Sequence, residues 1–412
     1  MTSINMAPLF AKANQHAYQK RERAFYTDRI QKSWGGGHIM KGRIPNDSSL
    51  VLMSNDYLSL ANDERIRKIQ ADTLMNTGNG LIMSSVFLHG ENPQGQLERR
   101  FAIFLQSEST VLCQSGWAAN VGLLQTIADS TTPVYIDMHA HMSLWEGIKS
   151  AGATAHGFRH NNISHIERQI RKHGQGIIVV DSIYSTNGSI CPLHDLVNVG
   201  ELYNCLMVVD ESHSLGTHGY QGEGLVASLG LTHRVHFRTA SLAKAFAGRV
   251  GIITCSSKFY EYFKCNSFPA IFSSSLLLHE IAALSQTLDI VIASNKERER
   301  LHRNADVLRT GLIELGYNVS VSQSQIIPLE AGPEQRTIKL RDALEAHDIF
   351  GAVFCAPATA KNRSMIRLSL NAALSATQIQ YTLEVLHKIR DKVDLDQWPS
   401  TSKLVRSNVV SL

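Results

Sequence analysis

Six short runs of β-branched and apolar residues recur between residues 110 and 255, and segments long enough for a helix separate most of them. These runs are continuously apolar, as strands buried on both faces are. Strands that alternate with helices form mostly parallel sheets covered on both faces. The sequence therefore predicts an α/β domain built on the runs TVLC, PVYID, GIIVVDS, CLMVVD, VHFRTA and GIITC.

The segments on either side of this region have other patterns. Residues 1–60 combine a helical stretch with a glycine-rich turn, WGGGHIMKGRIP, for which we expect a surface hairpin, because no GK[ST] follows to make a phosphate loop. We assign residues 61–290 to a large ligand-binding domain. Residues 291–395 mix helices with short strands, which predicts a smaller C-terminal α+β domain. Residues 396–412 are expected to form a loosely held tail.

The composition argues against several classes of protein. The formal net charge is only +4 and basic residues form no dense run, which argues against binding nucleic acid. Six scattered cysteines show neither CxxC nor metal-ligand spacing. No apolar stretch approaches the length of a membrane span, and no secretory leader is visible. We expect a reduced, cytoplasmic protein without a metal or a membrane span.

Lys244 stands among alanine, leucine, phenylalanine and small residues in TASLAKAFAGRVG. A buried, unpaired ammonium is costly, so such a lysine either finds a partner or loses its proton. A lysine with a lowered pKa is a nucleophile suited to Schiff-base chemistry with an aldehyde. The structural alternative is a lysine whose amine reaches out to solvent from the start of a helix.

Two further motifs place polar side chains directly after predicted strands. Asp210 ends an apolar strand in VVDESHSLG, where a carboxylate is costly unless it faces a fixed cation such as a protonated pyridine nitrogen. His213, three residues on, could hydrogen-bond a phenolate oxygen of the same ring. His141 in DMHAHMSLWEG could stack on a flat ring. The structural alternatives are an aspartate that caps a turn and a packed surface histidine.

The motif CQSGWAANVGLL follows a strand and opens a helix, and a helix start offers backbone N–H groups to a phosphate. An ordinary strand-to-helix turn is the alternative. Ser185 lies near the end of a further strand in DSIYSTNGSICPL. Ligands of open α/β sheets bind at the carboxyl ends of the strands, so all these groups are expected to share one site. Together they match the needs of pyridoxal 5′-phosphate (PLP).

From SNDYLSLA to IRLSLNAALS the chain resembles the α-oxoamine synthases, a family of fold-type I PLP enzymes. The motifs QSGWAANVGLLQTI, VDESHSLGTHG and PAIFSSSL most resemble its quorum-sensing autoinducer branch. The family joins an amino acid to an acyl-CoA with loss of carbon dioxide. The resemblance implies an α-aminoketone product, the precursor of an α-hydroxyketone signal. It implies S-adenosylmethionine or 2-aminobutyrate, with a medium-chain acyl-CoA, as substrates.

The resemblance also implies roles for the polar residues around the cofactor. Lys244 bonds to the cofactor, Asp210 pairs with its ring nitrogen, His213 contacts its ring oxygen and His141 stacks on the ring. Ser185 lies near the ring oxygen and the acyl group, and it joins Lys244, Asp210 and His141 as a candidate catalytic residue. The phosphate side is matched by Ser115, Gly116, Trp117 and Ser241.

Two more implied roles concern the partner subunit and the substrate. Ser274, in IFSSSL, matches a residue that reaches the phosphate from the partner subunit, which implies an obligate homodimer with shared active sites. Arg367 matches the arginine that holds the substrate carboxylate. Asn55 and Ser185 complete the expected substrate contacts.

The chain also departs from the pattern of its relatives. Where they carry GSGGSR…G…H, it has GLIMSSVFLHGENPQGQLE, which argues against members that use glycine, serine or alanine. Trp117 replaces a common tyrosine, and Ala243 a common glycine or serine. Three alternatives stay open: another synthase of the family, a transaminase or lyase of the same fold, and a catalytically silent relative that acts as a binding module.

Overall fold

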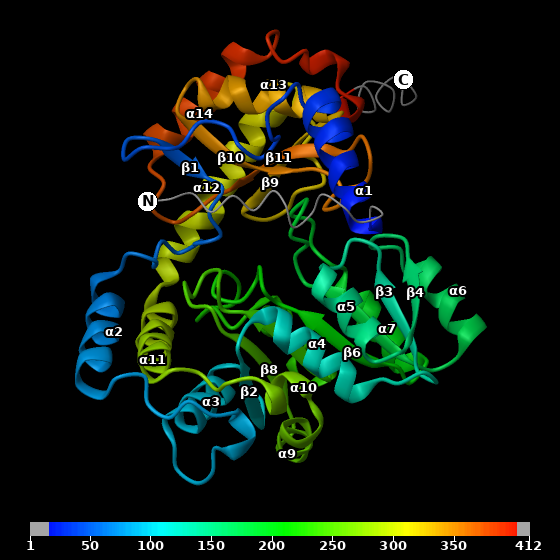
Figure 1. Ribbon diagram of the computed structural model, residues 1–412, viewed down its shortest axis with the longest axis vertical. Coiled ribbons are helices and arrows are strands. Elements are labelled where there is room, and N and C mark those ends of the chain that lie inside the picture. Colours follow the sequence, from blue (N-terminus) through cyan, green and yellow to red (C-terminus); the bar gives the residue numbers. More distant parts are fainter. Residues whose placement is uncertain (1–15, 402–412) are drawn as a thin grey trace.

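The computed structural model describes residues 16–401 and contains two sheets in two lobes (Figure 1). The larger sheet has seven strands, and only β8 runs antiparallel to its neighbours. In spatial order the strands are β2 (Ser109–Cys113), β8 (Gly251–Cys255), β7 (Phe237–Ser241), β6 (Leu206–Asp210), β5 (Ile177–Asp181), β3 (Pro133–Asp137) and β4 (Thr154–Phe158).

The six predicted runs all form strands of this sheet, which confirms the α/β fold class. The strand that the sequence did not reveal is β4, whose residues TAHGF include few large apolar side chains. It lies at the edge of the sheet, where its first two residues are exposed. An edge strand needs no apolar run because one side meets solvent.

Both faces of the large sheet are buried, and β5 shows this directly. Ile177 and Val179 belong to one apolar cluster, whereas Ile178 and Val180 belong to the other. The first cluster includes side chains of α4 and α5, and the second includes side chains of α6 and α7. The helices that surround the sheet are α3 (Pro93–Phe104), α4 (Gly116–Ile127), α5 (Met142–Ser150), α6 (Ile163–His173), α7 (Leu193–Leu202), α8 (Leu225–Ser228), α9 (Ser257–Asn266) and α10 (Phe268–Phe272).

The second sheet joins distant parts of the chain. Its order is β1 (Leu50–Leu52), β10 (Ile349–Phe354), β11 (Ser364–Ser369) and β9 (Ile326–Gly332). β1 pairs with β10 in parallel, and the other pairs are antiparallel. The helices α13 (Glu334–Glu345) and α14 (Ala376–Ile389) belong to this lobe. The segment YNVSVS at residues 317–322 forms no strand, because its backbone is irregular and turns at residues 320 and 321.

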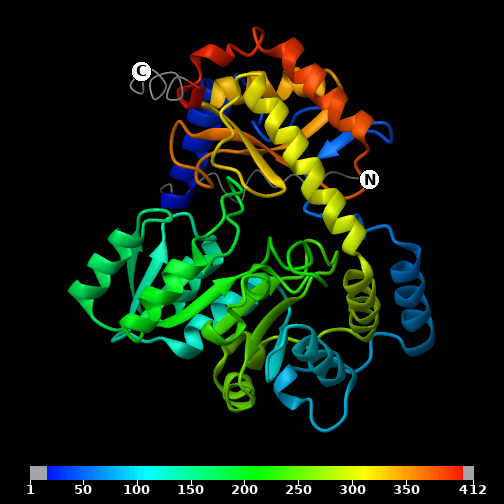
Figure 2. The same cartoon turned by 180° about the vertical axis from the view of Figure 1, so that it is seen from behind.

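Three long helices connect or flank the lobes. α2 (Glu64–Thr77) lies beside α11 (Leu278–Ala293), and α12 (Asn295–Glu314) crosses from the lower lobe to the upper one (Figure 2). The break between α11 and α12 falls at Ser294. The expected boundaries at residues 60, 290 and 395 stay a prediction.

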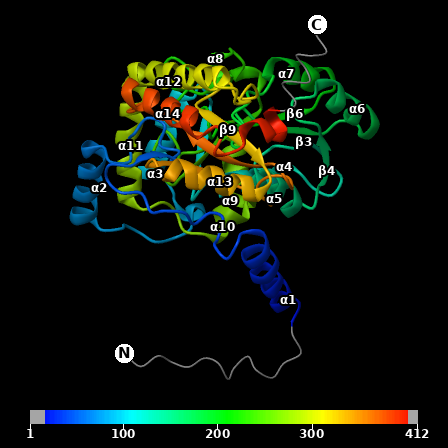
Figure 3. The ribbon, with the colours of Figure 1, turned by 90° about the horizontal axis from the view of Figure 1, so that it is seen from above.

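The N-terminal part of the described chain is a helix that projects from the body (Figure 3). α1 (Ala17–Ala24) runs directly into a π-helical segment (Phe25–Ser33). Arg29 and Trp34 then bind the Glu334 carboxylate at 2.5 and 2.7 Å. Residues 34–49 form turns rather than the expected hairpin, because the first strand begins at Leu50.

The ends of the chain lie outside the described residues. Residues 1–15 include part of the expected N-terminal helix, and residues 402–412 include most of the expected tail. Within residues 16–401, no helix combines the length and apolar character that a bilayer crossing requires.

Candidate active site

Asp210 ends β6 at the carboxyl edge of the large sheet and is 4% exposed. Its Oδ2 accepts a hydrogen bond from Asn120 Nδ2 at 2.6 Å, and its Oδ1 accepts one from the Ser212 backbone N–H at 2.8 Å. Asn120 is held in turn, because its Oδ1 accepts from Thr239 Oγ1 at 2.6 Å. Donors on both oxygens hold the carboxylate in a fixed orientation.

Lys244 follows β7 in a half-buried turn, close enough to Asp210 for their charges to interact. Burial lowers the pKa of Lys244 below its ordinary value, the Asp210 carboxylate opposes this shift, and the Arg367 guanidinium adds to it. A lowered pKa increases the fraction of Lys244 that is present as the neutral, nucleophilic amine. The structure thus brings Lys244 and Asp210 together, as the sequence predicted.

The start of α4 is pressed against the ends of β7 and β8. Ser115 caps the helix by accepting the Ala118 N–H at 3.1 Å. At Gly116 a Cβ atom would lie 2.5 Å from the Cβ of Ser241, so only glycine allows this approach. The first backbone N–H groups of a helix have no acceptor within it, so those of Gly116 and Trp117 are available to an anion. Trp117 itself is 49% exposed.

His141 caps the start of α5 (N-cap) beside the same edge. Its Nδ1 accepts the Ser143 N–H at 3.3 Å, so the neutral ring carries its proton on Nε2. Burial lowers the pKa of His141, with Asp210 opposing the shift and Lys244 adding to it. The backbone N–H of His141 donates to Asp181, which is buried, and Trp117 meets the imidazole edge-on at 6.2 Å.

His213 lies deeper, in the turn after β6. Its Nδ1 is 2.7 Å from Tyr57 Oη, and its carbonyl accepts from Gln325 Nε2 at 2.8 Å. Burial holds the pKa of His213 well below its ordinary value, with the charges of Lys244 and Arg367 adding to the shift. A neutral His213 can therefore serve as a hydrogen-bond partner without adding a positive charge.

Arg367 enters the site from β11 of the second sheet. Nη1 donates to the carbonyl of Ser185 at 2.8 Å, and Nη2 donates to Asn55 Oδ1 at 2.9 Å. Its guanidinium lies over the Phe354 ring at 4.6 Å. The buried Nε has no acceptor among the described residues. A buried donor left without a partner is costly, so Nε is suited to an anionic ligand.

Ser274 was expected to act across a subunit boundary. On its own chain it is exposed, and its carbonyl accepts from Gln114 Nε2 at 2.8 Å, one residue before the α4 cap. Its hydroxyl makes no hydrogen bond to the described residues that the structure shows.

The residues at this edge fit PLP. A half-buried lysine with a lowered pKa suits the aldehyde, and the anchored Asp210 suits the ring nitrogen. The first backbone N–H groups of α4, which begins at the glycine that the contact with Ser241 requires, suit the phosphate.

The comparisons agree with this site. Residues 48–386 match the aminotransferase class I and II family. The CAI-1 autoinducer synthase of Vibrio campbellii is 44% identical, over 90% of this chain and 94% of that protein. An 8-amino-7-oxononanoate synthase of Bacillus subtilis is 28% identical, over 84% of this chain and 89% of that protein.

Solved structures show the same fold. Serine palmitoyltransferase from S. paucimobilis with bound PLP superposes with a TM-score of 0.85 at 21% identity, covering 92% of this chain and all of that one. The 8-amino-7-oxononanoate synthase of Francisella tularensis gives 0.73 at 24%, covering 83% and 98%. Fold and site together define a PLP-dependent enzyme of fold type I. The chain belongs to the aminotransferase class I and II family and, within it, to the α-oxoamine synthases, which are acyltransferases.

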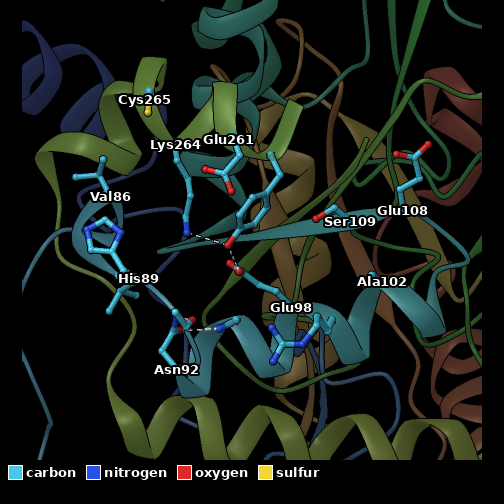
Figure 4. Close-up of a pocket in the computed structure, with 15 residues that line it drawn as sticks. Val86, His89, Asn92, Glu98, Ala102, Glu108, Ser109, Glu261, Lys264 and Cys265 are labelled. Atoms are coloured by element: carbon cyan, nitrogen blue, oxygen red, sulfur yellow. Dashed lines mark hydrogen bonds between the residues drawn. The ribbon is translucent and has the colours of Figure 1, made fainter. Parts of the chain in front are cut away.

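A cavity of about 460 Å³ lies elsewhere, between α3, α9 and the start of β2 (Figure 4). Inside it Lys264 Nζ donates to Tyr260 Oη, which donates to the buried Glu98, both over 2.8 Å. The start of β2 is at the amino edge of the sheet, opposite Asp210. This cavity is therefore separate from the candidate active site.

Sequence reasoning missed the residues that hold the predicted ones in place. Asn120 bonds Asp210, and Tyr57 bonds His213. Asn120 had a signal, because its polar side chain stands within the small and apolar run AANVGLL of α4. Tyr57 had none, since its partner is far away in the sequence.

Proposed function

We propose that this enzyme condenses S-adenosylmethionine or 2-aminobutyrate with a medium-chain acyl-CoA and releases carbon dioxide. The product is an α-aminoketone, the precursor of an α-hydroxyketone autoinducer. The observation that carries the proposal is the 44% identity to CAI-1 autoinducer synthase over nearly the full length of both chains. The departure from GSGGSR…G…H at residues 80–98 supports the same branch.

Bound PLP supplies an electron sink for the pair of electrons left when a bond to the amino acid's Cα breaks. Asp210, fixed by Asn120, would keep the proton on the ring nitrogen that makes the sink effective. His213 would hydrogen-bond the ring oxygen, and the first N–H groups of α4 would bind the phosphate, helped by Ser241.

Arg367 would hold the substrate carboxylate, using the Nε that has no protein acceptor. Asn55 and the Ser185 carbonyl orient the guanidinium for this contact. The neutral amine of Lys244 would take the proton from Cα, because burial favours its unprotonated form.

The condensation then needs a donor at the thioester oxygen. The Cα–acyl carbon bond forms while the C–S bond breaks and CoA leaves, and negative charge gathers on the oxygen in between. His141 Nε2–H, with the Ser185 hydroxyl, would donate to that oxygen. Carbon dioxide leaves when the Cα–carboxylate bond breaks, and Lys244 returns a proton to Cα.

The active site is proposed to be shared in a homodimer, with Ser274 reaching the phosphate of the partner subunit. The exposed position of Ser274 supports this. We place the enzyme in the cytoplasm, where acyl-CoA is available.

A second candidate is an α-oxoamine synthase that uses glycine, alanine or serine, and the 28% identity to 8-amino-7-oxononanoate synthases favours it. A substrate panel separates the two. The purified enzyme is given each amino acid with a series of acyl-CoAs, and release of free CoA thiol is measured. We expect turnover with S-adenosylmethionine or 2-aminobutyrate and a medium-chain donor. Turnover only with glycine, alanine or serine would assign the enzyme to the second candidate.

A further inference from the structure

The loop of residues 183–190 links the two sheets beside the candidate carboxylate site. Ile183 and Ile190 close the loop through a single antiparallel bridge. Within the loop, the carbonyl of Ser185 accepts from Arg367 Nη1 at 2.8 Å. The orientation of the Arg367 guanidinium therefore depends on how firmly this loop is held.

The second sheet holds the tip of the loop. The carbonyl of Gly188 accepts the Gln323 N–H at 3.0 Å and the Ser324 hydroxyl at 2.9 Å. Gly188 has φ +69°, and a Cβ there would lie 2.0 Å from the carbonyl oxygen of Ile326. The tip is thus packed against the segment that leads into β9.

The large sheet holds the other side of the loop through a histidine. His160 Nε2 lies 2.8 Å from Ser189 Oγ, and its Nδ1 lies 3.0 Å from Asp137 Oδ1. Asp137 ends β3, is fully buried, and also accepts the backbone N–H groups of His139 and Asn161. Asp137 is therefore a fixed anchor at the carboxyl edge of the sheet.

The hydrogen bonds and burial of Ser189 favour a structural role over that of a nucleophile. Asn187 Oδ1 accepts both the backbone N–H of Ser189 at 3.1 Å and its hydroxyl at 2.8 Å. The one hydroxyl proton of Ser189 faces two acceptors, Asn187 Oδ1 and His160 Nε2, while His160 Nδ1 donates to the Asp137 carboxylate. Ser189 is also only 4% exposed. Asp137, His160 and Ser189 are the residue types of a hydrolase triad, but here they hold a loop in place. We call these three residues the brace.

We propose that Asp137, His160 and Ser189 are positioning residues for the amino-acid substrate. They fix the loop so that the Ser185 carbonyl holds the Arg367 guanidinium, with Nε left free for the substrate carboxylate. The proposal rests on the proposed function, in which Arg367 binds that carboxylate. It assigns the three residues a role in amino-acid binding. Loosening the loop also shifts the Ser185 hydroxyl, but that group is proposed to donate where charge develops in the reaction, so its effect falls on kcat and leaves the KM for acyl-CoA unchanged.

Two substitutions at the same position test the brace. His160→Gln keeps an amide group near the position of Nε2, which faces Ser189. His160→Asn keeps an amide group only near the position of Nδ1, which faces Asp137. Both remove the imidazole, so their effects on packing are matched. Ser189→Ala removes only the hydroxyl that meets His160 Nε2. His156→Gln is the control elsewhere, because His156 on β4 stacks on His173 at 3.8 Å and has no part in the loop.

The measurement is the affinity of the PLP-loaded enzyme for 2-aminobutyrate without acyl-CoA, followed by the absorbance of the bound cofactor. The KM for acyl-CoA and the Tm are measured alongside. We expect His160→Asn and Ser189→Ala to weaken amino-acid binding about tenfold, as loss of one hydrogen bond does. His160→Gln should stay closer to the unmutated enzyme, and the KM for acyl-CoA should not change.

Two outcomes would overturn the proposal. One is unchanged amino-acid affinity in both His160→Asn and Ser189→Ala. The other is an equal rise in the KM for acyl-CoA, which would mark a general loss of structure. Arg367→Lys separates this inference from the proposed function. If Arg367→Lys weakens binding and His160→Asn does not, only the brace is wrong, and if neither does, the carboxylate role of Arg367 is wrong as well.

Discussion

Asn120 on α4 donates to Asp210 at the end of β6 over 2.6 Å, although 90 residues separate them in the sequence. The same amide also donates to Ser143 Oγ at 2.8 Å, next to the capping His141. Asn120 thereby connects two groups with proposed roles in the reaction, the Asp210 carboxylate and, through Ser143, the His141 imidazole.

Asn120→Ala should weaken cofactor retention. The substitution removes a hydrogen bond to a buried carboxylate, which costs about 1.5–3 kcal/mol, or about tenfold to a hundredfold in affinity. Titrating the apoenzyme with PLP by absorbance measures this. Thr126→Ala on the same helix is the control, because Thr126 bonds only the carbonyl of Gly122 in its own helix. Equal PLP affinity in the two variants would show that Asn120 does not support Asp210.

Gly116→Ala should push the start of α4 away from β7. The added Cβ would lie 2.5 Å from the Cβ and 2.9 Å from the Cα of Ser241, and overpacking of this kind costs about 1–3 kcal/mol. A lower Tm and weaker PLP binding are expected together. Gly95→Ala is the matched control on α3, since its nearest neighbour would be 3.4 Å away. A Gly116→Ala enzyme with normal Tm and normal PLP affinity would contradict this account.

His139→Phe should make the enzyme less sensitive to acid. Burial, helped by the nearby His160, lowers the pKa of His139 from 6.5 to about 4. The unfolded chain therefore binds one more proton than the folded enzyme between pH 6.5 and 4, and stability falls as the pH drops through this window. Phenylalanine keeps a ring stacked on His160, now 4.2 Å from His139, but cannot titrate.

Urea unfolding at pH 7 and pH 5 measures this effect. The unmutated enzyme should lose about 1–2 kcal/mol more than His139→Phe on going from pH 7 to pH 5, after allowing for the partial exposure of His139. Identical losses would mean that His139 titrates normally in the folded state.

The sequence was most informative where a signal is local. Apolar runs predicted six of the seven strands of the large sheet, and isolated polar residues at their ends pointed to Lys244 and Asp210. Edge strand β4 was not predicted, because one side of it faces solvent and it therefore needs no apolar run. The pairing of β1 with β10 was not predicted either. Its partners, such as Leu50 and Ile349, lie far apart in the sequence, and neither segment carries a pattern that identifies the other.

The supporting residues of the site were hidden for the same reason. Asn120 and Tyr57 gain their roles only through packing between segments far apart in the chain. The loop that places Ser185 is an intermediate case. The sequence pointed to Ser185 as a residue near the ring oxygen and the acyl group, whereas the structure shows its backbone carbonyl bound to Arg367.

The most direct test of a decarboxylating condensation at Lys244 follows the carboxylate carbon of the amino-acid substrate. The enzyme and its Lys244→Ala variant are incubated with 2-aminobutyrate labelled with ¹³C in the carboxylate and with a medium-chain acyl-CoA, and the products are read by mass spectrometry. We predict an unlabelled aminoketone, labelled carbon dioxide and free CoA from the unmutated enzyme alone. Label retained in the product, or equal turnover by Lys244→Ala, would contradict a decarboxylating condensation at this lysine.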